Sequence, residues 1–147
     1  MSDNLDTVNE SLQETITRGQ VVERVENWKS RLNLLFSDVR VWAEANTWRV
    51  DASASVSMHE PMMRQFDVPP TTQPVLRLDG DRGYALFKPK GLWVIGANGR
   101  IDLYTSKGAY TILDLAEYGQ APRWTIFRTT QKPAGEAFMA ELLSDLV

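Results

Sequence analysis

The feature that most restricts how this chain can fold is an apolar stripe that recurs at alternating steps of four and three residues over residues 20–45. This spacing places every member on one side of an α-helix of about six turns. The stripe consists of Val21, Val25, Trp28, Leu32, Leu35, Val39 and Trp42. Thr17 and Gln20 precede it with the spacing of a capping box, which predicts where the helix begins.

The breadth of the stripe indicates what it packs against. Val22, Phe36 and Ala43 make it wider than the narrow seam of a coiled coil. Most helical stability comes from burying such a face, and a strand pattern follows directly in the sequence. We therefore predict that the helix packs within the chain, with a homodimer through the same face as the alternative.

Apolar and polar residues then alternate over residues 48–58. This period of two is typical of a half-buried strand. Ala52 and Ala54 lie at its centre, and we expect them to leave room for a bulky helix side chain such as Trp28 or Phe36.

Residues 59–74 carry four of the seven prolines of the chain. Proline lacks the backbone donor that a sheet ladder needs, so we predict a long Pro-rich loop here. Structureless loops of this length are uncommon inside compact domains and often act as lids or binding loops.

The rest of the chain predicts an antiparallel meander and a closing helix. Turn signals separate six strand patterns, at residues 75–78, 84–88, 92–97, 100–105, 109–115 and 124–129. Beyond Pro133 an apolar spacing predicts a short helix that must dock on the sheet to be stable.

The chain is thus predicted to be a single α+β domain over residues 1–147. It has a long N-terminal helix, an antiparallel meander of six to seven strands, and a C-terminal helix packed on one sheet face. Residues 1–18 are predicted to be either a short helix or a flexible segment, because four apolar residues recur there at helical spacing: Leu5, Val8, Leu12 and Ile16.

Residues 91–115 are predicted to form two successive hairpins. Asn98-Gly99 suits a type I′ turn, which sets Trp93 opposite Tyr104. A three-residue loop at 106–108 then sets Arg100 opposite Asp114.

This register sorts the hairpin side chains onto two faces. One face is wholly apolar and suited to packing under a helix, with Val94, Ile101, Leu103, Leu113 and Leu115. The other is mixed, with Trp93, Ile95, Tyr104, Tyr110 and Ile112 among Arg100, Asp102 and Asp114. Aromatic residues joined by a few polar groups typically line a ligand pocket, whereas the structural interpretation is that cross-strand pairs stabilise a solvated face.

The five tryptophans divide in the same way. Trp28, Trp42 and Trp48 are predicted to lie in the core, which leaves Trp93 and Trp124 for a partner-contacting patch. The candidate binding residues are therefore Trp93, Arg100, Asp102, Tyr104, Tyr110, Asp114 and Trp124.

Composition excludes several classes of protein. A net charge of −3 and a pI near 5.2 disfavour nucleic acid as a partner, since phosphate binding needs clustered lysine and arginine. Without cysteine there is no disulfide, no thiolate nucleophile and no cysteine-containing metal site. No apolar run is long enough for a membrane span and the N-terminus has no leader character, so we expect a soluble, cytoplasmic protein that does not enter a membrane.

Catalytic chemistry has little support in the sequence. His59 is the only histidine, so two-histidine metal sites are excluded and any Ser-His-Asp arrangement must use it. Asp102 and Asp114 on neighbouring strands are candidate metal ligands, but structural salt bridging explains them better. We predict no cofactor and no metal.

The predicted function is a non-catalytic binding or adaptor protein, immunity-like or chaperone-like. It would hold a protein partner or a small molecule on the mixed sheet face, as a monomer or a homodimer. The acidic balance favours a basic partner surface. The alternative is a small hydrolase or lyase, with a pocket between the sheet face and residues 59–74 and with His59, Asp102 or Asp114 as acid–base residues.

Overall fold

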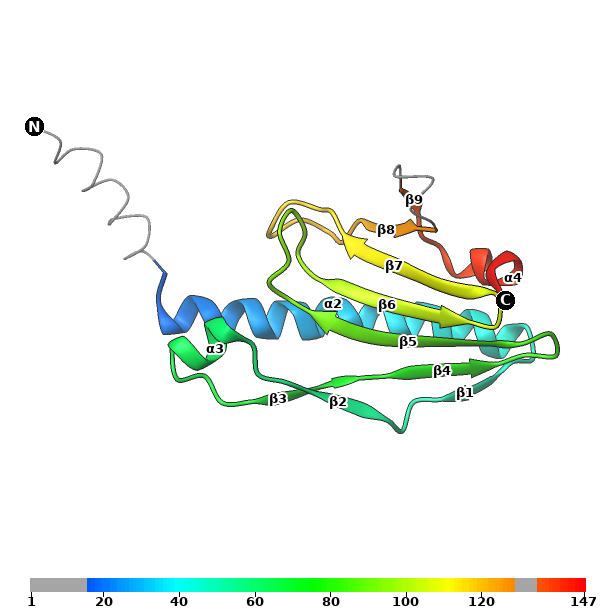
Figure 1. The fold of residues 1–147 in the computed structure, drawn as a ribbon, viewed down its shortest axis with the longest axis horizontal. Coiled ribbons are helices and arrows are strands. Elements are labelled where there is room, and N and C mark those ends of the chain that lie inside the picture. Colours follow the sequence, from blue (N-terminus) through cyan, green and yellow to red (C-terminus); the bar gives the residue numbers. More distant parts are fainter. Residues whose placement is uncertain (1–15, 129–134) are drawn as a thin grey trace, which may run out of the picture.

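The protein is a twisted antiparallel sheet with one long helix across one of its faces (Figure 1). The computed structural model describes residues 16–128 and 135–147, so most of the helix expected within residues 1–18 lies outside the described residues. The helices are α2 (Arg18–Ala45), α3 (Pro61–Gln65), the 3₁₀ turn η1 (Ala140–Leu142) and α4 (Leu143–Leu146). The strands are β1 (Arg49–Asp51), β2 (Ser55–Met58), β3 (Thr71–Pro74), β4 (Leu76–Asp79), β5 (Tyr84–Gly91), β6 (Arg100–Thr105), β7 (Gly108–Asp114), β8 (Trp124–Phe127) and β9 (Glu136–Ala137).

Seven of these strands form the main sheet, in the order β1-β4-β5-β6-β7-β8-β9, and every pairing is antiparallel. Strands β2 and β3 form a separate two-stranded sheet. The predicted α+β class, with its long helix, antiparallel sheet and packed C-terminal helix, is confirmed.

Helix α2 begins as its sequence predicts. The Thr17 hydroxyl accepts a hydrogen bond from the Gln20 amide, and the Gln20 side chain accepts one from the Thr17 amide, so the capping box is complete. Ile16 and Val21 occupy the two positions of a hydrophobic staple around this cap. Local sequence therefore sets both the start of the helix and the direction in which the chain enters it.

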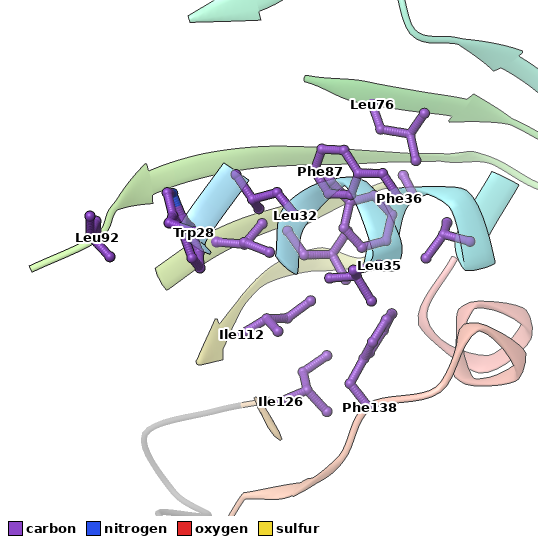
Figure 2. Close-up of a cluster of buried hydrophobic side chains, with 14 of the residues drawn as sticks. Trp28, Leu32, Leu35, Phe36, Leu76, Phe87, Leu92, Ile112, Ile126 and Phe138 are labelled. Carbon is purple, nitrogen blue, oxygen red and sulfur yellow. The ribbon is translucent and has the colours of Figure 1, made fainter. Parts of the chain in front are cut away.

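The apolar stripe of α2 packs on the sheet, so the predicted packing within the chain is confirmed. Its buried residues are Val21, Val25, Trp28, Arg31, Leu32, Leu35, Phe36, Val39 and Ala43. Figure 2 shows this stripe meeting Phe87 of β5, Ile112 of β7, Ile126 of β8 and Phe138. One member was not foreseen: Arg31, a charged residue, is buried within the stripe.

The strand expected over residues 48–58 is broken into β1 and β2. The Asp51 carboxylate accepts hydrogen bonds from the amide and the hydroxyl of Ser53, a local turn that ends β1. Ala52 and Ala54 are exposed, so the expectation that they make room for a helix side chain is wrong.

The predicted loop at residues 59–74 is also wrong in part, because it contains α3 and β3. Pro61 stands at the first position of α3, where its missing amide costs nothing, and Met63 is fully buried. Strand β3 includes Pro74 and pairs with β2. Proline is tolerated in both elements because of its position, which a count of prolines does not reveal.

The first predicted hairpin is absent. Strand β5 extends to Gly91 and pairs directly with β6, so residues 92–99 form the loop between them and not a strand with a type I′ turn. Asn98 is buried: its amide donates to the Asp114 carbonyl and its side chain donates to the Ala116 carbonyl. These tertiary contacts override the turn preference of Asn-Gly.

The second hairpin forms with a register that differs by one residue from the prediction. Thr105 pairs with Gly108 across a two-residue turn, and Ile101 pairs with Ile112 instead of Leu113. A slip of one residue moves every side chain of a strand to the other face. Residues Tyr110, Ile112 and Asp114 therefore point toward α2, contrary to expectation.

The end of the chain departs from the predicted helix. Residues 136 and 137 pair with β8 as strand β9, and helical structure begins only at Ala140. Leu143 and Leu146 are buried, which confirms that this short helix is docked.

Candidate functional site

The face of the sheet opposite α2 is the broadest candidate surface. No helix of the described residues covers it in Figure 1, where this face is turned toward the viewer. Cross-strand register aligns Leu86, Tyr104 and Ala109 in one row, and Lys88, Asp102, Thr111 and Phe127 in the next. Leu113 and Thr125 belong to a third row that begins at Arg100. We call these residues the outer sheet face.

Three of the predicted binding residues lie together on the outer sheet face: Arg100, Asp102 and Tyr104. Arg100 Nε donates to Asp102 Oδ1 over 2.8 Å, and the Tyr104 residue is 39% exposed. A hollow of about 320 Å³ between these residues, Phe127 and Arg128 is open to solvent, and a fourth predicted residue, Tyr110, contributes to its lining. The face is thus a mixture of apolar surface and charges of both signs.

Asp114 is separated from them and lies inside the protein. Its side chain is 0% exposed, and its Oδ2 accepts a hydrogen bond from Arg31 Nη1 over 2.6 Å. Its Oδ1 accepts the amides of Ala116 and Arg123, at 3.1 and 2.9 Å. This carboxylate therefore ties the loop after β7 to helix α2, and the expected pairing of Arg100 with Asp114 does not occur.

Tyr110 and Trp124 also belong to the inner side. Both are partly buried and pack against the core, and the Trp124 ring lies 6.0 Å from that of Trp28. The prediction that Tyr110 lies on the mixed face is wrong for the same reason as for Asp114, since both lie on β7 and depend on the β6–β7 register. Trp124 was a candidate for a partner-contacting patch with no face assigned, and it lies on β8.

Trp93 lies elsewhere, beside a pocket at the N-terminal end of α2. This pocket has a volume of about 270 Å³ and an apolar lining that includes Val21, Met62 and Tyr118. Burial raises the pKa of the Tyr118 hydroxyl, and the nearby Glu23 adds to that shift. Trp93 and Tyr104 are thus parts of two different surfaces.

The acid–base residues of the enzyme alternative do not meet. His59 lines a small hollow with Arg64, Asp67 and Pro69, and its Nε2 lies 3.1 Å from the Val68 carbonyl oxygen. Asp102 lines the outer sheet face and Asp114 is buried with Arg31. Across residues 16–128 and 135–147, no group of three His, Asp or Glu residues is placed to hold a metal ion.

Two residues with clear structural roles were missed in the sequence. Arg31 lies three residues after Trp28 and four before Leu35, so helical spacing places it on the apolar face of α2, although its residue type is typical of a solvated position. Glu60 accepts the backbone amides of Leu92 and Trp93 at 2.9 and 3.4 Å, which anchors the loop before β6. The local sequence does not identify the partner of either residue, because each partner is distant along the chain.

Comparison with known proteins adds no family. No family model matches the sequence, and searches of curated proteins and of solved structures found no significant match. In the part of the chain that the structure describes, no helix is long and apolar enough to cross a membrane.

Proposed function

We propose that this protein is a non-catalytic binding protein that holds a protein partner on the outer sheet face. The observation that supports the proposal most strongly is that α2 covers only one side of the sheet, while aromatic and aliphatic side chains stand on the other. Tyr104 and Phe127 are the aromatic members, and tyrosine in particular is enriched at binding hot spots. A broad and open surface suits a protein better than a small molecule, which prefers an enclosed pocket.

The charges of the outer sheet face indicate what kind of partner surface we expect. Residues 1–15 hold four acidic residues and no basic one, whereas residues 16–147 hold 16 basic and 15 acidic residues. On the sheet itself Arg77 pairs with Asp79, and Arg100 pairs with Asp102. The expectation of a basic partner surface is therefore not extended to this face, because the residues that define it include two basic side chains, Lys88 and Arg100, and one acidic side chain, Asp102. We propose a partner with an apolar centre and a mixed polar rim.

The test measures which proteins of a lysate bind to variants of this protein. Each variant changes a single residue on one of its surfaces. Tyr104→Arg places a charge at the centre of the outer sheet face without removing a buried side chain. Leu34→Arg is the matched control, because Leu34 is 61% exposed on α2, the helix that covers the other side of the sheet. Each immobilised variant is exposed to the same lysate, and the captured proteins are quantified by mass spectrometry after circular dichroism has confirmed the fold.

A partner of the outer sheet face is expected to be retained by the parent and by Leu34→Arg, and to be captured at least about tenfold less by Tyr104→Arg. A separate variant, Trp93→Ala, reports on the pocket at the N-terminal end of α2. His59→Ala is expected to change nothing. If Tyr104→Arg captures the same proteins in the same amounts as the parent, the proposed function is wrong.

A further inference from the structure

A second surface lies at the N-terminal end of α2, apart from the outer sheet face. Four segments build its pocket: the first turns of α2, helix α3, the loop before β6 and the loop after β7. Figure 1 shows α3 and the N-terminal end of α2 at the same end of the molecule. The apolar walls are Ile16, Val21, Met62, Trp93 and Tyr118.

The walls of this pocket are held in place by contacts outside it. The capping box fixes the first turn of α2, and Glu60 holds the backbone of Trp93. The Arg24 guanidinium lies 4.8 Å from the centre of the Tyr118 ring, a cation–π contact that orients this ring. The pocket is therefore preformed, yet its apolar rim is open to solvent: Ile16 is 42% exposed and Tyr118 is 46% exposed.

The size of the pocket indicates the kind of group that fills it. Its volume of about 270 Å³ is below the roughly 300–1,000 Å³ of sites for drug-sized ligands. It exceeds the roughly 150 Å³ of a cavity that accepts one benzene ring. One or two aliphatic side chains of a peptide fit these limits better than a cofactor does.

We propose that the occupant is the chain's own N-terminal segment, with Val8 and Leu12 as the side chains that enter the pocket. Ile16 is both a wall of the pocket and the residue at which the preceding fifteen residues join the described structure. Leu5, Val8 and Leu12 continue the apolar spacing that ends at Ile16. An extended chain spans about 3.3–3.6 Å per residue, so both side chains can reach the pocket easily.

The N-terminal segment has an advantage over a separate peptide or apolar molecule, because it is covalently attached beside the pocket. Attachment through a few residues of chain gives the segment an effective concentration in the millimolar range. A separate peptide or apolar molecule would need to exceed that concentration or bind much more tightly. The attached segment therefore fills even a weak site first.

The charges of the N-terminal segment and of the pocket rim are compatible with this occupant. The acidic residues of the segment, Asp3, Asp6, Glu10 and Glu14, alternate with its apolar positions and can stay in water. At the start of α2, Arg18 is exposed and Arg24, which lines the pocket, is half-buried; Glu23 opposes them. The net attraction at this rim is modest, so apolar burial provides most of the stabilisation.

The experiment uses the absence of cysteine in the chain. Asn9→Cys introduces a single thiol, to which a nitroxide spin label is attached, in the full-length protein. The label broadens the methyl resonance of Met62 when residue 9 is held beside the pocket. Met139, which precedes η1 at the other end of α2, provides the reference signal.

Leu12→Asp in the labelled protein is expected to reduce the broadening at Met62 severalfold, because it removes the apolar anchor. Gln13→Asp is the matched control: it adds the same charge one residue away and should leave the broadening unchanged. Tyr118→Asp, on the pocket side, is expected to reproduce the effect of Leu12→Asp.

Equal broadening at Met62 in the parent and in Leu12→Asp would overturn the proposal, since the tether alone would then explain the signal. An equal loss with Gln13→Asp would overturn it as well. Tyr104→Arg should leave the Met62 signal unchanged, so this test fails or succeeds independently of the outer sheet face.

Discussion

Asp114→Asn is expected to be among the most destabilising single substitutions in this protein. The change keeps an oxygen at Oδ1, so the hydrogen bonds from the amides of Ala116 and Arg123 can persist. It removes the negative charge that faces Arg31 at 2.6 Å. The guanidinium is left with Asn27 Oδ1 and the Gln120 carbonyl as its acceptors, neither of which carries a charge.

The magnitude follows from the burial of this pair. The side chains of Arg31 and Asp114 are 6% and 0% exposed, so water cannot solvate the charge that remains. Breaking a buried pair by removing one partner costs about 3–5 kcal/mol. Since domains are stable by only about 5–15 kcal/mol, about a fifth or more of the free energy of unfolding would be lost. At about 2–4 °C per kcal/mol, the melting temperature would fall by about 6–20 °C.

The assay is urea denaturation of the parent and the variants at neutral pH, with the slope of the transition checked for constancy. Asp102→Asn is the matched control, because it removes the charge of a pair whose side chains are 14% exposed for Asp102 and 41% exposed for Arg100. The control is expected to cost at most about 1 kcal/mol. Arg31→Met combined with Asp114→Asn should cost less than the sum of the two single changes, because no charge remains unpaired.

Similar losses for Asp114→Asn and Asp102→Asn would refute this reasoning, since the two aspartates would then not differ in burial or in role. Additive effects in the double variant would also contradict it, because they would mean that Arg31 and Asp114 do not interact.

Three further substitutions test separate parts of the structure. Thr17→Ala removes the hydroxyl that caps α2 and should cost about 0.5–2 kcal/mol in thermal or urea unfolding, whereas Ser30→Ala in the same helix should cost far less. Gly99→Ala would place a Cβ against the buried Trp28 ring, closer than van der Waals contact allows, so we expect a loss of about 1–3 kcal/mol; an unchanged unfolding midpoint would contradict the close packing. Ser53→Ala should raise the pKa of Asp51 toward its ordinary value of 3.8, because the hydroxyl and amide of Ser53 now lower it, and NMR titration of the Asp51 carboxyl would show no change if that hydrogen bond were absent.

The helix α2, its cap and its buried stripe could all be predicted from the sequence. Each rests on interactions between residues three or four positions apart, so the information lies within a short stretch of chain. The extents of β4, β6 and β7 were also predicted closely, since turn residues and alternation mark them. The overall α+β class followed from the order of these elements.

The candidate site could be predicted only in part. Arg100, Asp102 and Tyr104 share a face because all three lie on one strand, where a period of two places them together. Trp93 was assigned to that face through a hairpin that does not form. The prediction that Tyr110 and Asp114 share this face depends on a β6–β7 register that is one residue off.

The register of β6 with β7 was decided by the tertiary structure alone. Both registers place apolar residues opposite apolar residues, so the local pattern distinguishes them poorly. The difference lies with Arg31, which is 83 residues from Asp114 in sequence and supplies the buried charge that lets this carboxylate face inward. Sequence by itself thus determined the elements, which depend on near neighbours; only the folded chain determined which way β7 faces, because that depends on a partner from a distant helix.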